Sequence, residues 1–241
     1  MELPFTAHTF LEEITANGFS IIPNVLEAEE VASLLSAIEA ACNESMNIGR
    51  GGIRNLLDRV PEVRVVAESS TIRRLVDPIL GERAFAARGI LFDKTPEANW
   101  KVPWHQDLTI AVQGRTEATG FGPWTVKAGV NHVQPPTEVL ENMVAVRIHL
   151  DECREDNGPM RVIPGSHSKG RLTAEQIQSI QLSSPSVACS VGRGGVLVMR
   201  PLLLHASSAA SLPSHRRVIH IDFVSYHLPV GLRWFSEDTN R

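Results

Sequence analysis

The sequence predicts a mainly β protein with flanking helices, built as two packed sheets with a helical layer outside. Short apolar segments of strand length dominate after residue 83, Gly and Pro separate them at irregular spacing, and helical periodicity is concentrated before residue 82. No linker composition marks a boundary. We therefore expect a single domain over residues 1–241, with a helical front at about 1–82 and a β core at about 83–226.

Apolar residues at helical spacing predict four helices in the front, at residues 9–17, from 24 or 27 onward, at 60–68 and at 70–80. The second helix has one apolar face, made by Val31, Leu34, Leu35 and Ile38. Gly18 and Gly81 end the first and last helices, because glycine favours the turn that follows a helix. An apolar strand at 19–23 follows the first helix.

The β core is expected to hold six strands, at residues 84–92, 102–107, 143–150, 160–163, 195–200 and 218–225. One helix interrupts them, since Thr173 stands three residues before Gln176 as in a capping box. In the last strand, alternation places His220 and Asp222 on one face and Ile219 and Ile221 on the other.

The segment 108–142 shows little periodicity and holds several Gly and Pro residues. A long irregular insertion of this kind favours a lid or substrate loop. A packed surface flap anchored by Trp124 is the alternative. If the segment is a lid, its candidate substrate contacts are Trp124, Lys127, His132 and Gln134.

A candidate metal centre is encoded by Trp104-His105-Gln106-Asp107 and by a distant histidine, His205. His105 and Asp107 are two residues apart, so on a strand their side chains leave from one face. Two imidazoles and one carboxylate occupy three neighbouring corners of an octahedron and leave three open, as in non-haem Fe(II) oxygenases. A structural zinc site would add a fourth protein ligand.

An arginine, Arg216, opens the last predicted strand, eleven residues after His205. There it is placed to bind a carboxylate through two parallel N–H contacts. The alternative is a solvated charged group at a strand end.

These residues resemble the phytanoyl-CoA dioxygenase family of Fe(II)/2-oxoglutarate-dependent oxygenases. The resemblance covers about 85–223 and includes four further motifs: Phe92-Asp93-Lys94-Thr95-Pro96, Asp156-Asn157-Gly158-Pro159-Met160-Arg161-Val162-Ile163-Pro164-Gly165-Ser166-His167, Gly194-Gly195 and His205-Ala206-Ser207. It implies a double-stranded β-helix, also called a jelly roll or cupin-like fold. It also implies Fe(II), 2-oxoglutarate and O2 as cofactor and co-substrates.

Carried over position by position, the resemblance makes His105, Asp107 and His205 the catalytic iron ligands. Arg216 matches the arginine that holds the distal carboxylate of 2-oxoglutarate, and Ser207 and Lys94 match positions that line its pocket. Arg147 stands where some relatives carry an aromatic residue beside the co-substrate, and is a further candidate contact. Because relatives that halogenate lack the carboxylate ligand, Asp107 implies hydroxylation of a small organic molecule, with release of succinate and CO2.

Two other function classes remain open. One is a metal-containing jelly-roll module that binds a ligand or regulates without turnover, and the intact Arg216 disfavours it. The other is a cupin-like metal-dependent isomerase or hydrolase, which would recruit a further ligand such as His132, His149 or His220.

Composition agrees with a cytoplasmic enzyme. The net charge of −4 and the lack of a basic cluster argue against nucleic acid as partner, and no apolar run has the length of a membrane helix. The start of the chain shows no signal-peptide pattern, and the three widely spaced cysteines indicate reduced thiols. A small-molecule substrate is expected, whereas neither its identity nor the oligomeric state follows from the sequence.

Overall fold

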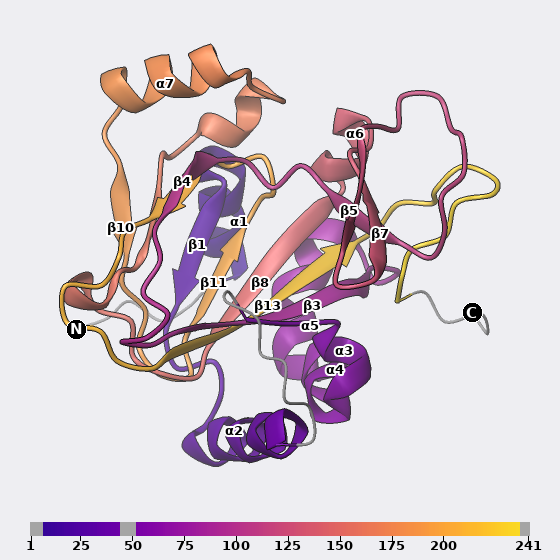
Figure 1. Cartoon of the computed structure of the whole chain (residues 1–241). Helices are drawn as coiled ribbons and strands as arrows, with labels where there is room; N and C mark the ends of the chain where they lie inside the picture. The colour runs from indigo at the N-terminus through magenta and orange to yellow at the C-terminus, as the bar shows by residue number, and fades with distance from the viewer. Residues whose placement is uncertain (1–6, 44–51, 237–241) are drawn as a thin grey trace.

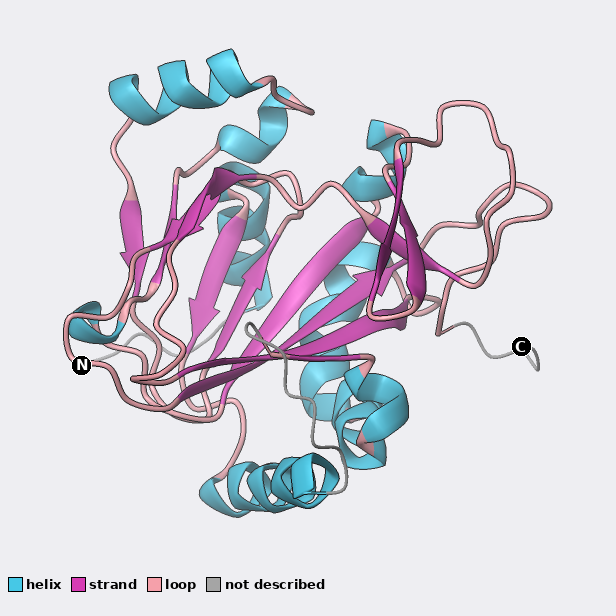
Figure 2. Cartoon of the chain, viewed as in Figure 1, coloured by secondary structure: helices cyan, strands magenta, loops and turns pink. Residues whose placement is uncertain are grey.

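The computed structural model describes residues 7–43 and 52–236, and the described strands form three antiparallel sheets (Figures 1 and 2). The large sheet has the order β1 (Phe19–Ile22), β11 (Val196–Met199), β8 (Met143–His149), β13 (Arg216–Val224), β3 (Phe85–Lys94) and β2 (Ile53–Arg54). The second sheet has the order β10 (Val187–Cys189), β9 (Met160–Val162), β12 (His205–Ser207) and β4 (Val102–His105). The third consists of β5 (Ile110–Val112), β7 (Val130–Val133) and β6 (Trp124–Lys127).

Helices from the front of the chain cover one face of the large sheet. They are α1 (Ala7–Asn17), α2 (Ala28–Asn43), α3 (Leu56–Arg59), α4 (Pro61–Glu68) and α5 (Ser70–Leu80). In Figure 1, α3, α4 and α5 lie beneath β3 and β13, whereas α7 (Ala174–Ser183) lies on the opposite side above β4 and β10. The remaining helix, α6 (Thr137–Glu141), and two 3-10 turns at Glu155–Asn157 and Ser166–Lys169 lie between strands.

The two faces of the large sheet differ in chemistry because side chains alternate along each strand. On β13, Ile219, Ile221 and Phe223 are almost fully buried and join the apolar core beneath the helices. His220 and Asp222 point to the other face, and both are also buried. The sheet therefore presents an apolar face to the helices and a polar, enclosed face to the interior of the barrel.

Close packing between the helical front and the sheet depends on Gly89 of β3. A side chain at this position would bring its Cβ within 2.9 Å of Cγ of Leu57 in α3. The glycine thus lets α3 lie directly against the strand. Leu56 and Leu57 are buried there, which ties the front to the barrel.

The mainly β class with flanking helices is confirmed, and the helices expected in the front are present within a few residues of their expected ends. The description of 108–142 as irregular is wrong in part, because this insertion carries the third sheet and α6. Its strands are only three or four residues long, too short for a clear period-two pattern. β2 and β10 were also missed for this reason. Within the described ranges, no helix has the length and hydropathy needed to cross a bilayer.

Candidate metal centre

The three predicted metal ligands lie together where β4 and β12 meet. His105 is the last residue of β4 and pairs directly with His205, the first residue of β12. Asp107 lies two residues beyond the end of β4, and its backbone N–H donates to the carbonyl of Pro201. Its carboxylate oxygens lie 4.0 Å from Nε2 of His105 and 3.6 Å from Nε2 of His205. The strand register therefore brings together ligands that are far apart in the sequence.

Both histidine rings are oriented by the backbone. Nδ1 of His105 lies 2.8 Å from the carbonyl of Pro103, and Nδ1 of His205 lies 2.8 Å from the carbonyl of Leu203. When Nδ1–H donates to such a carbonyl, the neutral ring keeps its lone pair on Nε2. Both Nε2 atoms face Asp107, as the ligands of one metal ion must.

The protonation states also suit a metal ion. Burial lowers the pKa of His205 to about 4, so the ring is neutral at physiological pH. Burial alone would raise the pKa of Asp107, but the nearby His205 and His220 outweigh it and leave this pKa below its usual value. The ligand atoms lie within 4.8 Å of one another, and in the described part of the chain no fourth His, Cys, Asp or Glu joins them. This set fits a divalent ion with open coordination positions, not a closed zinc site.

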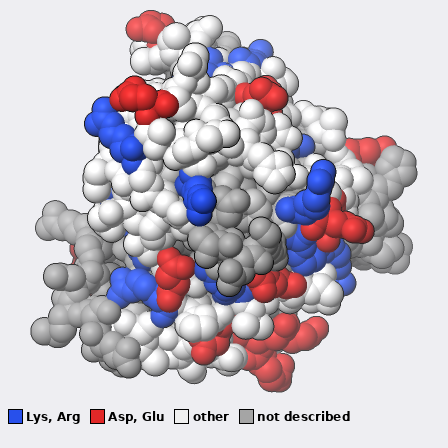
Figure 3. Space-filling view, turned by 90° about the vertical axis from the view of Figure 1, so that its right-hand side faces the viewer, with Lys and Arg blue, Asp and Glu red and all other residues white. Residues whose placement is uncertain are grey.

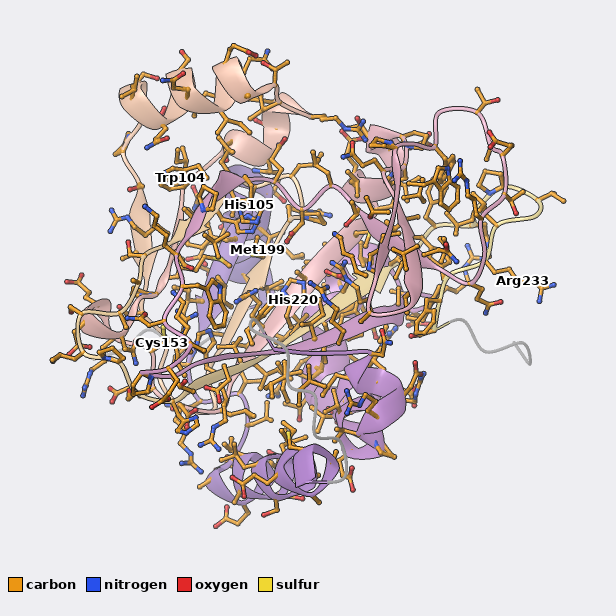
Figure 4. The ribbon with its side chains drawn as sticks, in the orientation of Figure 1. Trp104, His105, Cys153, Met199, His220 and Arg233 are labelled. Carbon is orange, nitrogen blue, oxygen red and sulfur yellow. The ribbon has the colours of Figure 1, made fainter. Side chains whose placement is uncertain are left out.

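A cavity of about 200 Å³ opens beside the three ligands. Its basic lining residues are Arg54, Arg88, Lys127, Arg147 and Arg216. Apolar walls come from Ile90, Phe92, Trp100, Val102 and Met160. In Figure 4, His105 of β4 and His220 of β13 lie in the central part of the molecule. The cavity thus combines a metal-binding rim with an unusual density of positive charge.

One end of the cavity is built around Arg216. Its Nη1 donates to the carbonyl of Gly158, while its Nε is buried and has no hydrogen-bond partner among the described residues. Lys94 lies behind this end, where Nζ donates to Oγ of Ser207 (3.3 Å) and to the carbonyl of Ser208. Burial and the neighbouring Arg216 lower the pKa of Lys94 to about 8. An acidic ligand that accepts a hydrogen bond from Nε of Arg216 would pair this buried group. Its negative charge would also favour the charged form of Lys94.

The backbone at Gly158 requires glycine. Its φ of +71° is left-handed, and a Cβ here would lie 2.6 Å from the carbonyl oxygen of Ser208 and 3.1 Å from Nζ of Lys94. Glycine therefore keeps room for the two cations at this end of the cavity.

A match to a protein-family model shows to which family the chain belongs. Residues 14–218 match the model described as phytanoyl-CoA dioxygenase (PhyH). The chain belongs to the phytanoyl-CoA dioxygenase family. No curated protein sequence matches it.

Solved structures resemble this family member over most of its length. The α-ketoglutarate-dependent carbocyclase SnoK from nogalamycin biosynthesis is 17% identical, with 92% of this chain and 87% of SnoK covered at a TM-score of 0.70. The epimerase SnoN, in complex with Fe3+, α-ketoglutarate and nogalamycin RO, is 16% identical, with coverages of 90% and 83% and a TM-score of 0.70. EctD from S. alaskensis, with 2-oxoglutarate and 5-hydroxyectoine, is 17% identical, with coverages of 93% and 77% and a TM-score of 0.69.

These similarities confirm the jelly-roll, double-stranded β-helix fold that the sequence led us to expect. Family and fold together indicate an enzyme of the iron- and 2-oxoglutarate-dependent oxygenase type. Two of the neighbours are named for cyclisation and epimerisation, so the fold alone does not specify the reaction.

A row of buried, hydrogen-bonded side chains crosses the interior face of this family member's large sheet. Nη1 of Arg147 lies 2.8 Å from Nδ1 of His220, Nε2 of His220 lies 2.9 Å from Asp222, and Asp222 accepts from Nε of Arg88 at 2.6 Å. Burial alone would raise the pKa of Asp222, but Arg88 and His220 hold it far below the usual range. Burial, followed by Arg216, lowers the pKa of Arg147 to about 10.

The predicted substrate contacts divide into two groups. Lys127 and Arg147 line the cavity. Trp124, His132 and Gln134 are not among its lining residues. The ring of Trp124 lies 5.7 Å from the guanidinium of Arg115, and Nδ1 of His132 lies 3.1 Å from the carbonyl of Val130.

Arg54 and Arg88 line the cavity although the sequence did not single them out. Arg88 stands two residues before Ile90 and four before Phe92 on a predicted strand, so period-two alternation places all three on one face, which lines the cavity. Arg54 belongs to a two-residue strand and carries no comparable signal.

Proposed function

We propose that this protein is an Fe(II)- and 2-oxoglutarate-dependent dioxygenase that hydroxylates a small organic molecule and releases succinate and CO2. The observation that carries the proposal is the open His105, Asp107 and His205 set beside a cavity that ends at the buried, partly unpaired guanidinium of Arg216. A metal site next to a buried cation suits a ligand that chelates metal at one end and carries a carboxylate at the other.

The roles of the residues follow from this geometry. His105, Asp107 and His205 would hold Fe(II), which together with 2-oxoglutarate and O2 supplies the oxidising chemistry when bound. Arg216 binds the distal carboxylate of the co-substrate, and its Nε–H has no other partner among the described residues. Lys94 positions Ser207 by its hydrogen bond, and the apolar walls exclude water from the reaction space.

Hydroxylation is our choice among the reactions that this fold supports. The carboxylate ligand Asp107 is present, and it stands where halogenating relatives lack a carboxylate. Mass spectrometry after reaction under 18O2 tests this choice, because hydroxylation places one labelled oxygen atom in the product. A product without added oxygen would identify a cyclisation or epimerisation instead.

Succinate formation tests the proposal as a whole. Protein loaded anaerobically with Fe(II) is given 2-oxoglutarate and then O2, and wild type is compared with Arg216→Ala and with the exposed control Arg193→Ala. We expect succinate from the wild type and the control, and a large rise in the KM for 2-oxoglutarate in Arg216→Ala. The proposal fails if the wild type neither forms succinate nor binds 2-oxoglutarate by calorimetry. Binding without turnover would favour the regulatory module.

The geometry gives little support to the alternative of an isomerase or hydrolase that recruits a further metal ligand. Both ring nitrogens of His220 are engaged, by Arg147 and by Asp222, so this ring has no free lone pair for a metal. His132 and His149 also lie outside the cluster of ligand atoms. Conversion of a substrate in the absence of O2 would nevertheless identify an isomerase or hydrolase.

A further inference from the structure

The cavity has a second cationic end, which the proposed reaction leaves without a role. It is formed by Arg54 of β2, Arg88 of β3 and Lys127 of β6. Three separate elements therefore contribute one cation each, and one of them, β6, belongs to the inserted sheet.

Strand register separates this end from Arg216. In the β13–β3 pair, Arg216 lies opposite Lys94, and Asp222 lies opposite Arg88. Six residues of extended strand span roughly 20 Å. Asp107 is close enough to both Arg88 and Lys127 to favour their charged forms. The second cationic end is therefore beside the metal ligands but far from the guanidinium assigned to 2-oxoglutarate.

The charges at this end are only partly compensated. Arg88 is paired with Asp222 at 2.6 Å. Among the described residues, Nζ of Lys127 has only the hydroxyl of Thr109, at 3.3 Å, and the Arg54 side chain has no hydrogen bond or ion pair. Burial, and then repulsion from Arg88, lowers the pKa values of both Lys127 and Arg54. Two half-buried cations without an ion pair to any described residue cost stability, and an anionic ligand would recover that cost.

One face of the molecule shows no matching concentration of positive charge. On the face shown in Figure 3, basic and acidic side chains are interspersed. Inside the cavity, by contrast, five basic residues face the single lining carboxylate of Asp107. A 2-oxoglutarate dianion at Arg216 would satisfy only the end that holds Arg147 and Arg216.

We infer that the substrate carries a carboxylate or phosphate group, which binds between Arg54 and Lys127 with Arg88 as a third donor. This inference rests on the proposed function, since it assigns the other end of the cavity to 2-oxoglutarate. An oxyanion held there bridges the barrel strand β2 and the inserted strand β6, so it fastens the insertion over the metal centre. Arg54 and Lys127 are thus the residues that select an acidic substrate.

Nuclear relaxation tests the inference directly, because paramagnetic Fe(II) accelerates the relaxation of nearby nuclei. Anaerobic protein loaded with Fe(II) and saturated with 2-oxoglutarate is titrated with inorganic phosphate, observed by 31P, and with acetate, observed by 13C. Wild type is compared with Arg54→Gln/Lys127→Gln, which removes two charges at similar side-chain volume. The matched control is Lys169→Gln/Arg193→Gln, at two exposed cations away from the cavity.

We expect saturable relaxation enhancement in the wild type and the control, and at least about tenfold weaker binding in Arg54→Gln/Lys127→Gln, since a charge-assisted contact is worth about 1.5 kcal/mol or more. The tighter of the two probes distinguishes a phosphate-bearing from a carboxylate-bearing substrate. Equal binding by the wild type and the double variant, or no saturable binding of either probe, overturns the inference.

Calorimetry with the same probes separates failure of this inference from failure of the proposed function, because it needs neither iron nor turnover. Probe binding that depends on Arg54 and Lys127 in a protein that forms no succinate would retain the anion site and overturn only the dioxygenase assignment. Succinate formation without such binding would retain the dioxygenase assignment and overturn the anion site.

Discussion

The two histidine ligands differ in their surroundings although each is held by the same backbone contact. The side chain of His105 is 37% exposed, whereas that of His205 is 5% exposed. Asp107 lies between them in accessibility and faces both rings. An ion held at this centre would therefore be reached from the His105 side, and His205 would hold it on the interior side.

Replacement of Asp107 tests the ligand set without a large change in volume. We expect Asp107→Asn to lose Fe(II) affinity by more than the roughly 10- to 100-fold that loss of an outer-shell partner costs, because a neutral amide is a weaker ligand. Equilibrium dialysis with Fe(II) measures the affinity, and circular dichroism checks that the fold is kept. The control is Asp58→Asn on an exposed ion pair. Unchanged iron affinity in Asp107→Asn would remove this carboxylate from the site.

Asp222 is expected to contribute more to stability than an exposed carboxylate. Its partner Arg88 is also largely buried, so Asp222→Asn leaves a buried cation without its counter-charge. We expect a loss of about 3–5 kcal/mol in the free energy of unfolding, measured with urea, against about 0–1 kcal/mol for Asp58→Asn. A loss below 1 kcal/mol in Asp222→Asn would show that Arg88 finds another partner.

The pH dependence of Asp222 has a definite sign. Because its folded pKa is depressed, its contribution is complete above the ordinary carboxyl pKa of 3.8 and is lost as the pH falls through the folded value. The stability difference between wild type and Asp222→Asn should accordingly shrink on acidification below pH 3.8. A constant difference would contradict the depressed pKa.

Lys94 should make stability rise with pH in the alkaline range. Its folded pKa of about 8 lies below the ordinary 10.5, so between these values the unfolded chain binds more protons than the folded protein. Wild-type stability should therefore rise relative to Lys94→Met across this window, by about 3 kcal/mol at most. Urea unfolding of both proteins from pH 7.5 to 10.5, without 2-oxoglutarate, measures the difference. A flat difference would mean that Lys94 stays charged.

How far the sequence predicts the site depends on how local each signal is. His105 and Asp107 are two residues apart, and Arg216 opens a long alternating strand, so their placement could be inferred. The position of Arg54 beside the site is set by strand pairing. Arg54 lies opposite Ile90 of β3, and Ile90 lies opposite His220 of β13. Such a row across three strands is set by long-range register, which no local pattern in one sequence encodes.

At the scale of elements, the inserted sheet differs most from the sequence-based expectation. β6 and β7 are joined by Ala128 and Gly129, both with positive φ, as in a two-residue type I′ hairpin. Asn-Gly or Asp-Gly is the usual signal for this turn, and alanine at its first position hides it. The hairpin therefore forms despite its turn sequence, through pairing of both strands and the burial of Val130 and Val133.

Substitution at Ala128 tests this account of the hairpin. The φ of 50° suits asparagine better than alanine and is worst for a β-branched residue. We expect Ala128→Asn to slow amide hydrogen exchange in β6 and β7, by about 0.5–1 kcal/mol of opening free energy, and Ala128→Val to accelerate it. If the two variants exchange alike, the turn does not control the stability of the inserted sheet.

At the scale of the whole molecule, we propose that the helical front and the β barrel form one cooperative domain. The front contributes β1 and β2 to the two edges of the large sheet. One apolar core joins side chains of α1 to α5 with the outward face of β8 and β13. Separate domains would each need a core of their own.

Equilibrium unfolding tests this unity, because the two parts report through different signals. All four tryptophans, Trp100, Trp104, Trp124 and Trp234, lie outside the helical front, so their fluorescence follows the barrel, while the helical circular dichroism signal comes largely from the front. We expect both signals to change at the same urea concentration.

Leu57→Ala sharpens the test, because Leu57 lies in the front and packs against β3. The truncation should cost about 2–5 kcal/mol and shift both transitions by the same amount, since a single domain shares one free energy of unfolding. A shift confined to the dichroism signal would divide the chain into two folding units.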